Sequence, residues 1–211
     1  MKYGESLFDI CYLVFAIGTG IMLFLSKNKE TRMMALASLI LGIGDSFHLV
    51  PRVCNYFITG NWQVYLGLGK LVTSITMTLF YLCLYRLWLF RYNQEEKMGV
   101  TKEINLMVLT RILLCLAPQN GWIDGNDSLF WAILRNVPFV LLGIKVGSLY
   151  YQKRKESIFS SMWVLIVLSF GFYLPVALGA SYIPMLGMLM LPKTICYIGM
   201  LILFIRRARE I

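Results

Sequence analysis

The chain has 211 residues, of which 58% are hydrophobic and only 15% are charged, and its formal net charge is +9. Soluble domains carry about 25% charged residues on average. The mean hydropathy of +0.68 therefore excludes an ordinary soluble enzyme and predicts one integral membrane domain that covers residues 1–211.

Seven apolar segments follow one another along the chain, at residues 7–25, 34–51, 65–90, 104–118, 129–150, 159–178 and 183–205. Most of them reach the ~20 residues that a helix needs to cross a bilayer core. The pattern predicts an all-α bundle of seven transmembrane helices. Segment 104–118 is short and carries Arg111, so six crossings with a re-entrant fourth segment are an alternative. Pro51 is expected to end the second helix.

Basic residues between the segments predict the orientation. The first, third and fifth connectors and the C-terminal tail carry three each: Lys27, Lys29 and Arg32; Arg91, Lys97 and Lys102; Lys153, Arg154 and Lys155; Arg206, Arg207 and Arg209. The other side carries only Lys2 and Arg52. By the positive-inside rule the N-terminus is outside and the C-terminus is cytoplasmic. For a bacterial-type cell, the expected location is the cytoplasmic (inner) membrane. This topology explains the basic balance, so no nucleic-acid partner is expected. Trp122 is expected among the aromatic residues at the outer interface.

Residues 7–90 and 129–205 suggest an internal repeat. The runs LFDICYLVFAIGTGIMLFLSKNKET and LFWAILRNVPFVLLGIKVGSLYYQKRKES both begin with Leu-Phe and both end in a basic connector. Lys70 and Lys193 occupy comparable places in the third and seventh segments. With segment 104–118 as a linker helix, these half-repeats predict a 3+1+3 plan with a site between the halves. Chance similarity between two apolar segments is the alternative.

Three ionisable residues follow one another at helical spacing in the second segment. Asp45, His48 and Arg52 are three and four residues apart, which places them on one helix face. Gly42 and Gly44 precede them and predict a close helix–helix approach. His48 is the only histidine in the chain, and no Cys-x-x-Cys pair occurs. Neither a metal site nor a cofactor is therefore expected.

The other segments add more polar side chains. Exposing a charge to lipid costs at least about 2.5–3.5 kcal/mol. The charged side chains among them should therefore face the interior of the bundle, together with Asp45. The surplus of positive charge predicts an outward-facing basic pocket for an anionic or amphiphilic small molecule or a lipid head group. Asp45 pairing with Lys70 or Arg135 merely to lock helices is the alternative. The expected ligand-binding residues are Lys70, Ser74, Tyr81, Arg111, Arg135, Lys193 and Tyr197.

The run LGIGDSFHLVP resembles, at Gly44 and Asp45, the Gly-Asp-x-x-Leu signature of lysoplasmalogenase-like membrane proteins. The match covers about one helix, its leucine lies one residue late, and the family's later Ser-Asp signature is absent. The resemblance implies lysolipid hydrolysis, with Asp45 as the catalytic acid and His48 as a proton carrier. The Ser-Phe-His piece also resembles alkaline-ceramidase-like hydrolases, but the zinc of that family requires further histidines.

The 3+1+3 plan resembles the SWEET and PQ-loop transporters and the KDEL-receptor type. This resemblance implies proton-coupled transport of a small solute, with Asp45 and His48 coupling the proton movement. Pro118-Gln119 is a literal Pro-Gln pair, but it falls at an outer end. A receptor or partner subunit without chemistry is a third interpretation. The sequence does not choose among these functions and carries no signal for the oligomeric state.

Overall fold

The computed structural model describes residues 2–92, 98–125, 128–155, 158–179 and 183–211. Lys97, which entered the orientation prediction, and residues 156–157 and 180–182 of the second predicted half-repeat lie outside these ranges. The α-helices are α1 (Lys2–Phe24), α2 (Lys29–Phe57), α3 (Gln63–Arg91), α4 (Met98–Leu116), α5 (Leu129–Gln152), α6 (Met162–Gly179) and α7 (Met190–Ala208). Short 3-10 helices occupy Pro118–Asn120, Ile158–Ser161 and Pro184–Leu189.

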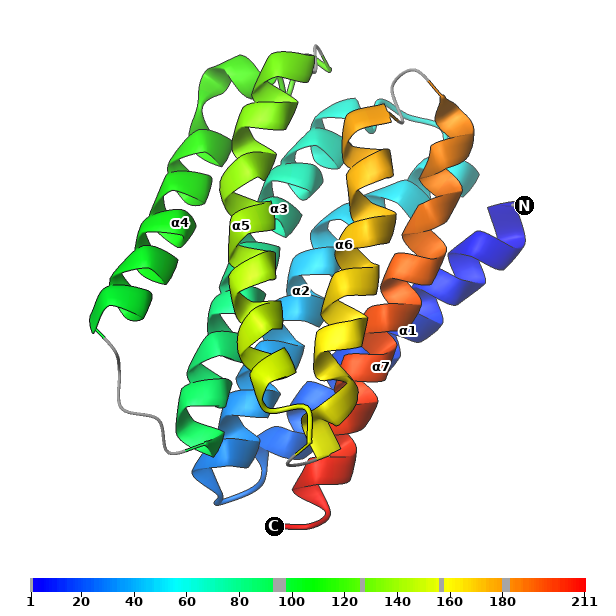
Figure 1. The fold of residues 1–211 in the computed structure, drawn as a ribbon. Helices are drawn as coiled ribbons and strands as arrows, with labels where there is room; N and C mark the ends of the chain where they lie inside the picture. Colours follow the sequence, from blue (N-terminus) through cyan, green and yellow to red (C-terminus); the bar gives the residue numbers. More distant parts are fainter. Residues whose placement is uncertain (1, 93–97, 126–127, 156–157, 180–182) are drawn as a thin grey trace.

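The predicted all-α fold with seven helices is confirmed for the described residues. Six of these helices, all except α4, are long and apolar enough to cross a membrane. The helices form one bundle, and the two termini lie toward opposite ends of it (Figure 1). These features identify a multi-pass membrane protein. The orientation, the identity of the membrane and the internal repeat stay predictions.

Helix α4 stands at the edge of the bundle beside α5 (Figure 1) and packs on α3 and α5. Its 19 residues span about 28 Å at the usual rise per residue, close to the thickness of a bilayer core. Arg111 faces the interior and is only 1% exposed. The outer face carries a leucine stripe that is 55–65% exposed, at Leu106, Leu109, Leu113 and Leu116. This distribution supports the predicted seventh crossing, which stays a prediction.

The prediction that Pro51 ends the second helix is wrong, because α2 continues to Phe57. Pro51 has no backbone N–H, so the carbonyl of Phe47 lacks its usual helical donor. Gly69 of α3 packs directly on this carbonyl, and a Cβ added at Gly69 would lie 2.2 Å from the Phe47 oxygen. The close packing of α3 against this turn supports α2 on both sides of the proline.

The close approach predicted at Gly42 and Gly44 is confirmed. A Cβ at Gly42 would lie 2.9 Å from Ile17 Cγ1 of α1, and a Cβ at Gly44 would lie 2.0 Å from Thr76 Oγ1 of α3. Thr73 Oγ1 also donates a 3.1 Å hydrogen bond to the Gly44 carbonyl. Helix α2 is therefore held between α1 and α3, and this fixes the direction in which its polar face points.

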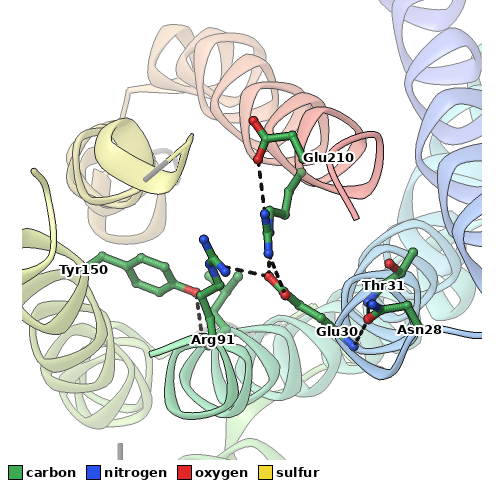
Figure 2. A network of polar contacts seen from close by, with 8 residues as sticks. Asn28, Glu30, Thr31, Arg91, Tyr150 and Glu210 are labelled. Atoms are coloured by element: carbon green, nitrogen blue, oxygen red, sulfur yellow. Dashed lines mark hydrogen bonds and ion pairs between the residues drawn. The ribbon is translucent and has the colours of Figure 1, made fainter. Parts of the chain in front are cut away.

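An ion-pair network around the buried Glu30 joins α2, α3 and α7 at one end of the bundle (Figure 2). Glu30 accepts two hydrogen bonds from Arg207, at 2.9 Å from Nε and 3.1 Å from Nη2. Arg91 Nε lies 3.7 Å from the same carboxylate. Asn28 caps the start of α2 by accepting the backbone N–H of Glu30 at 2.8 Å. One acidic side chain thus holds three helix ends together.

Candidate functional site

A cavity of about 220 Å³ lies in the opposite half of the bundle, where α3, α5 and α7 begin and α4 and α6 end. Helices α2 to α7 all contribute to its wall. No aspartate or glutamate of the described residues lines it. The cavity brings together most of the predicted site residues, namely His48, Lys70, Ser74, Arg111, Arg135 and Lys193.

Arg111 is a fully buried cation of this wall. Its Nη1 donates to the backbone carbonyl of Arg135, and its guanidinium lies 5.0 Å from the centroid of the Phe139 ring. Its Nε is buried and has no hydrogen-bond partner among the described residues. It also forms no ion pair within the described segments. Within the described ranges the guanidinium therefore contacts one carbonyl and one aromatic face, and its Nε–H donor has no acceptor.

Lys193 is the second buried cation without an ion pair in the described part of the chain, and it is 9% exposed. Its Nζ lies 4.7 Å from the centroid of the Tyr173 ring and 5.5 Å from that of Tyr197. Asp45 attracts it electrostatically from α2 without forming an ion pair. The aromatic faces offset only part of the cost of burying the ammonium group, because each of them contributes about 0.5–2 kcal/mol.

The turn after α4 positions the third cation of the wall. Asn120 is fully buried, and its Nδ2 donates to the carbonyls of Leu114 at 2.6 Å and Ala117 at 2.8 Å. These bonds satisfy carbonyls that the end of α4 leaves without helical donors. The Oδ1 of Asn120 accepts a 2.7 Å hydrogen bond from Arg135 Nη1. One amide thus caps α4 and orients Arg135.

Trp122 also belongs to this wall, although the sequence suggested an interfacial position. Its side chain is buried, its Nε1 donates a 2.8 Å hydrogen bond to the Cys115 carbonyl, and the Arg135 guanidinium lies 4.3 Å from its ring centroid. Gly67 of α3 gives room for this turn, because a Cβ there would lie 1.6 Å from the Trp122 carbonyl oxygen. Sequence reasoning missed the role of Asn120. The Asn-Gly pair directly after an apolar segment is a helix-termination signal that points to such a cap.

His48 and Lys70 complete the polar wall from α2 and α3. The Nδ1 of His48 is buried and has no hydrogen-bond partner within the described ranges. Lys70 is exposed, so it stands at the mouth of the cavity. The hydroxyl of Ser74 donates back to the Lys70 carbonyl at 2.8 Å, which leaves its oxygen lone pairs as acceptors.

Asp45, His48 and Arg52 were predicted to share one helix face, but their side chains contact different parts of the structure. Asp45 does not line the cavity and accepts a 2.6 Å hydrogen bond from Tyr12 of α1. Arg52 pairs with Asp9 at 2.5 Å and lies 3.5 Å from a Glu5 oxygen, also on α1. Only His48 of the three lines the basic cavity.

Tyr81 and Tyr197 lie in the core beneath the cavity and do not line it. The Tyr81 hydroxyl is 2.9 Å from Ser169 Oγ, and its ring centroid is 5.5 Å from that of Phe139. The Tyr197 ring packs edge-on to Phe80 at 5.9 Å. Both tyrosines therefore support the wall from behind, and direct contact of either with a ligand stays a prediction.

Within the described ranges, no group of three or more histidine, cysteine, aspartate or glutamate residues is placed to hold a metal ion. Comparison of the chain with protein-family models, with curated proteins and with solved structures found no significant match. The functions implied by the lysoplasmalogenase-like and transporter-like resemblances stay predictions.

Proposed function

We propose that this membrane protein binds an anionic head group in the basic cavity. The observation that carries the proposal is the pair Arg111 and Lys193. Both cations are buried in one cavity wall, and neither has a carboxylate partner among the described residues. Lys70 and Arg135 add positive charge to the same wall.

The energetics favour an anion as the missing partner. Removing a charge from water costs several kcal/mol even after the protein relaxes, which exceeds the contribution of the surrounding aromatic faces. An anion between Arg111 and Lys193 offsets this cost for both cations. A phosphate monoester fits best, because it brings up to two negative charges and three acceptor oxygens, and the planar guanidinium can bind two of these oxygens at once.

The same geometry supports binding more directly than lysolipid hydrolysis. A general acid must lie within hydrogen-bond reach of the group that it protonates. Asp45 is bonded to Tyr12 and does not line the cavity. His48 lines the cavity, and its imidazole can both accept and donate a proton, so it is the candidate proton carrier if a reaction or proton-coupled transport follows binding.

The binding site is tested with purified protein in detergent. Inorganic phosphate is titrated against chloride at equal ionic strength, and its dissociation constant is obtained from the rise in thermal stability that ligand binding produces. Lys193→Met should weaken phosphate binding at least tenfold, because it removes the buried charge at nearly constant side-chain length. Lys145→Met is the matched control, since Lys145 pairs with Glu103 on a partly exposed surface outside the cavity.

Two outcomes contradict the proposal. The first is that phosphate stabilises the wild type no more than chloride does. The second is that Lys193→Met binds phosphate as tightly as Lys145→Met. If Lys193→Met does not fold, Lys193→Gln tests the same charge. Product formation from lysolipids, or uptake into liposomes driven by a proton gradient, then assigns hydrolysis or transport to the occupied site.

A further inference from the structure

A second hollow lies on the outside of the bundle, between α5 and α6. It has a volume of about 250 Å³, and Asn136 is the single polar residue in its wall. The remaining lining is aliphatic: Ile133, Val137, Val140, Leu141, Leu174 and Leu178. Several of these side chains are well exposed, so this α5–α6 groove faces the hydrocarbon of the surrounding bilayer.

Asn136 belongs to the wall of the groove and to the wall of the basic cavity. Its Oδ1 accepts a 2.8 Å hydrogen bond from the hydroxyl of Tyr173, and its Nδ2 donates at 2.8 Å to the Ala132 carbonyl. Tyr173 lines the basic cavity, and Lys193 Nζ lies over its ring. A single hydrogen-bonded pair, Asn136 with Tyr173, therefore stands where the groove meets the cavity.

A proline interrupts the backbone hydrogen bonding of each helix beside the groove. Pro138 lies in α5 and Pro175 in α6, and each removes one helical hydrogen bond close to the groove. Helix α6 is the least enclosed of the candidate spans. In its most apolar stretch 17% of the residues are buried, against 33–44% in the other five spans. The surface of α6 is therefore more open to the surrounding lipid than that of the other candidate spans.

We propose that the ligand is a single-chain anionic amphiphile that enters from the bilayer. This inference rests on the proposed function. The phosphate monoester head lies in the basic cavity, the chain leaves past Asn136 and Tyr173, and its first methylenes lie in the α5–α6 groove. The positive charges of the basic cavity favour an anionic head group. The adjoining aliphatic groove favours a ligand with a hydrocarbon chain, which a simple water-soluble anion lacks.

The test compares methyl phosphate with decyl phosphate on two tryptophan variants in one detergent. Val137→Trp fills the groove. Ile144→Trp is the matched control, because Ile144 is 61% exposed on the same helix and does not line the groove. Each buried methylene tightens binding about fourfold. Val137→Trp should therefore bind decyl phosphate at least tenfold more weakly than Ile144→Trp, while both variants bind methyl phosphate equally. Partitioning of the probe into detergent is the same for both proteins and cancels.

Equal affinity of the two variants for decyl phosphate overturns the amphiphile inference. If methyl phosphate still binds in a Lys193-dependent manner, the proposed function survives that result and the natural ligand is a soluble anion. If neither probe binds the wild type, the proposed function itself fails. Leu174→Trp fills the same groove from α6 and replaces Val137→Trp if that variant does not fold.

Discussion

The hydroxyl of Tyr12 donates a 2.6 Å hydrogen bond to Oδ2 of Asp45 and joins α1 to α2 behind the basic cavity. Asp45 therefore belongs to the α1–α2 contact, although His48, one turn later on the same helix, lines the cavity. The carboxylate still attracts Lys193 across the bundle. Its charge acts on the cavity although its side chain does not line it.

Asp45→Asn should preserve the fold and raise the affinity for phosphate severalfold. The amide oxygen can still accept the Tyr12 hydroxyl, while the loss of a negative charge near Lys193 increases the positive potential in the cavity. The phosphate dissociation constant checks this prediction. A stable Asp45→Asn protein that no longer binds phosphate contradicts it. Tyr12→Phe is the companion variant, and it should cost about 1–3 kcal/mol of stability because it leaves a buried acceptor without its donor.

Asn120→Ala should destabilise the protein by about 2–3 kcal/mol and weaken phosphate binding. The substitution removes the donors that cap the end of α4 and the acceptor that orients Arg135, and each buried polar group left unpaired carries a desolvation cost. Unfolding in a graded series of denaturing detergent gives the stability. Gln119→Ala is the control, since Gln119 is exposed in the same turn. Equal stability of the two variants argues against the cap.

Glu30→Gln should lower the stability by about 3 kcal/mol without changing the affinity for phosphate. It leaves the partly buried Arg207 and Arg91 without the buried carboxylate between them (Figure 2), and removing one partner of an ion pair that is largely shielded from water is costly. Glu210→Gln removes the exposed partner of the same arginine and should cost less than about 1 kcal/mol. A change in phosphate affinity in Glu30→Gln would show that the two ends of the bundle are coupled.

Gly67→Ala should reduce both stability and phosphate binding. Its new methyl group would overlap the Trp122 carbonyl, and a backbone atom cannot move aside as a flexible side chain can. The turn that carries Trp122 and Asn120 must then shift away from the wall. Gly171→Ala is the control, because no atom lies within 4 Å of the Cβ position there, and alanine favours the helix by about 1 kcal/mol. Unchanged binding in Gly67→Ala would contradict the role given to this contact.

The amino-acid sequence by itself determined the class of protein and the helices. A bilayer core requires apolar runs of a fixed length, and these runs are visible without a structure. It also identified the cationic residues of the wall, because lysine and arginine inside apolar segments must face an interior. Lys193 and Arg111 were found in this way, and the structure places both in one cavity.

Only the tertiary structure decided how the residues of one helix divide among its neighbours. Helical spacing fixes that Asp45, His48 and Arg52 share a face, but that face is wide enough to contact both α1 and the cavity. The glycine contacts of α2 set its rotation, which directs Asp45 and Arg52 to α1 and His48 to the basic cavity. Asn120 and Tyr173 acquired their roles for the same reason. Their partners lie on other segments, and sequence spacing does not encode the distance between helices.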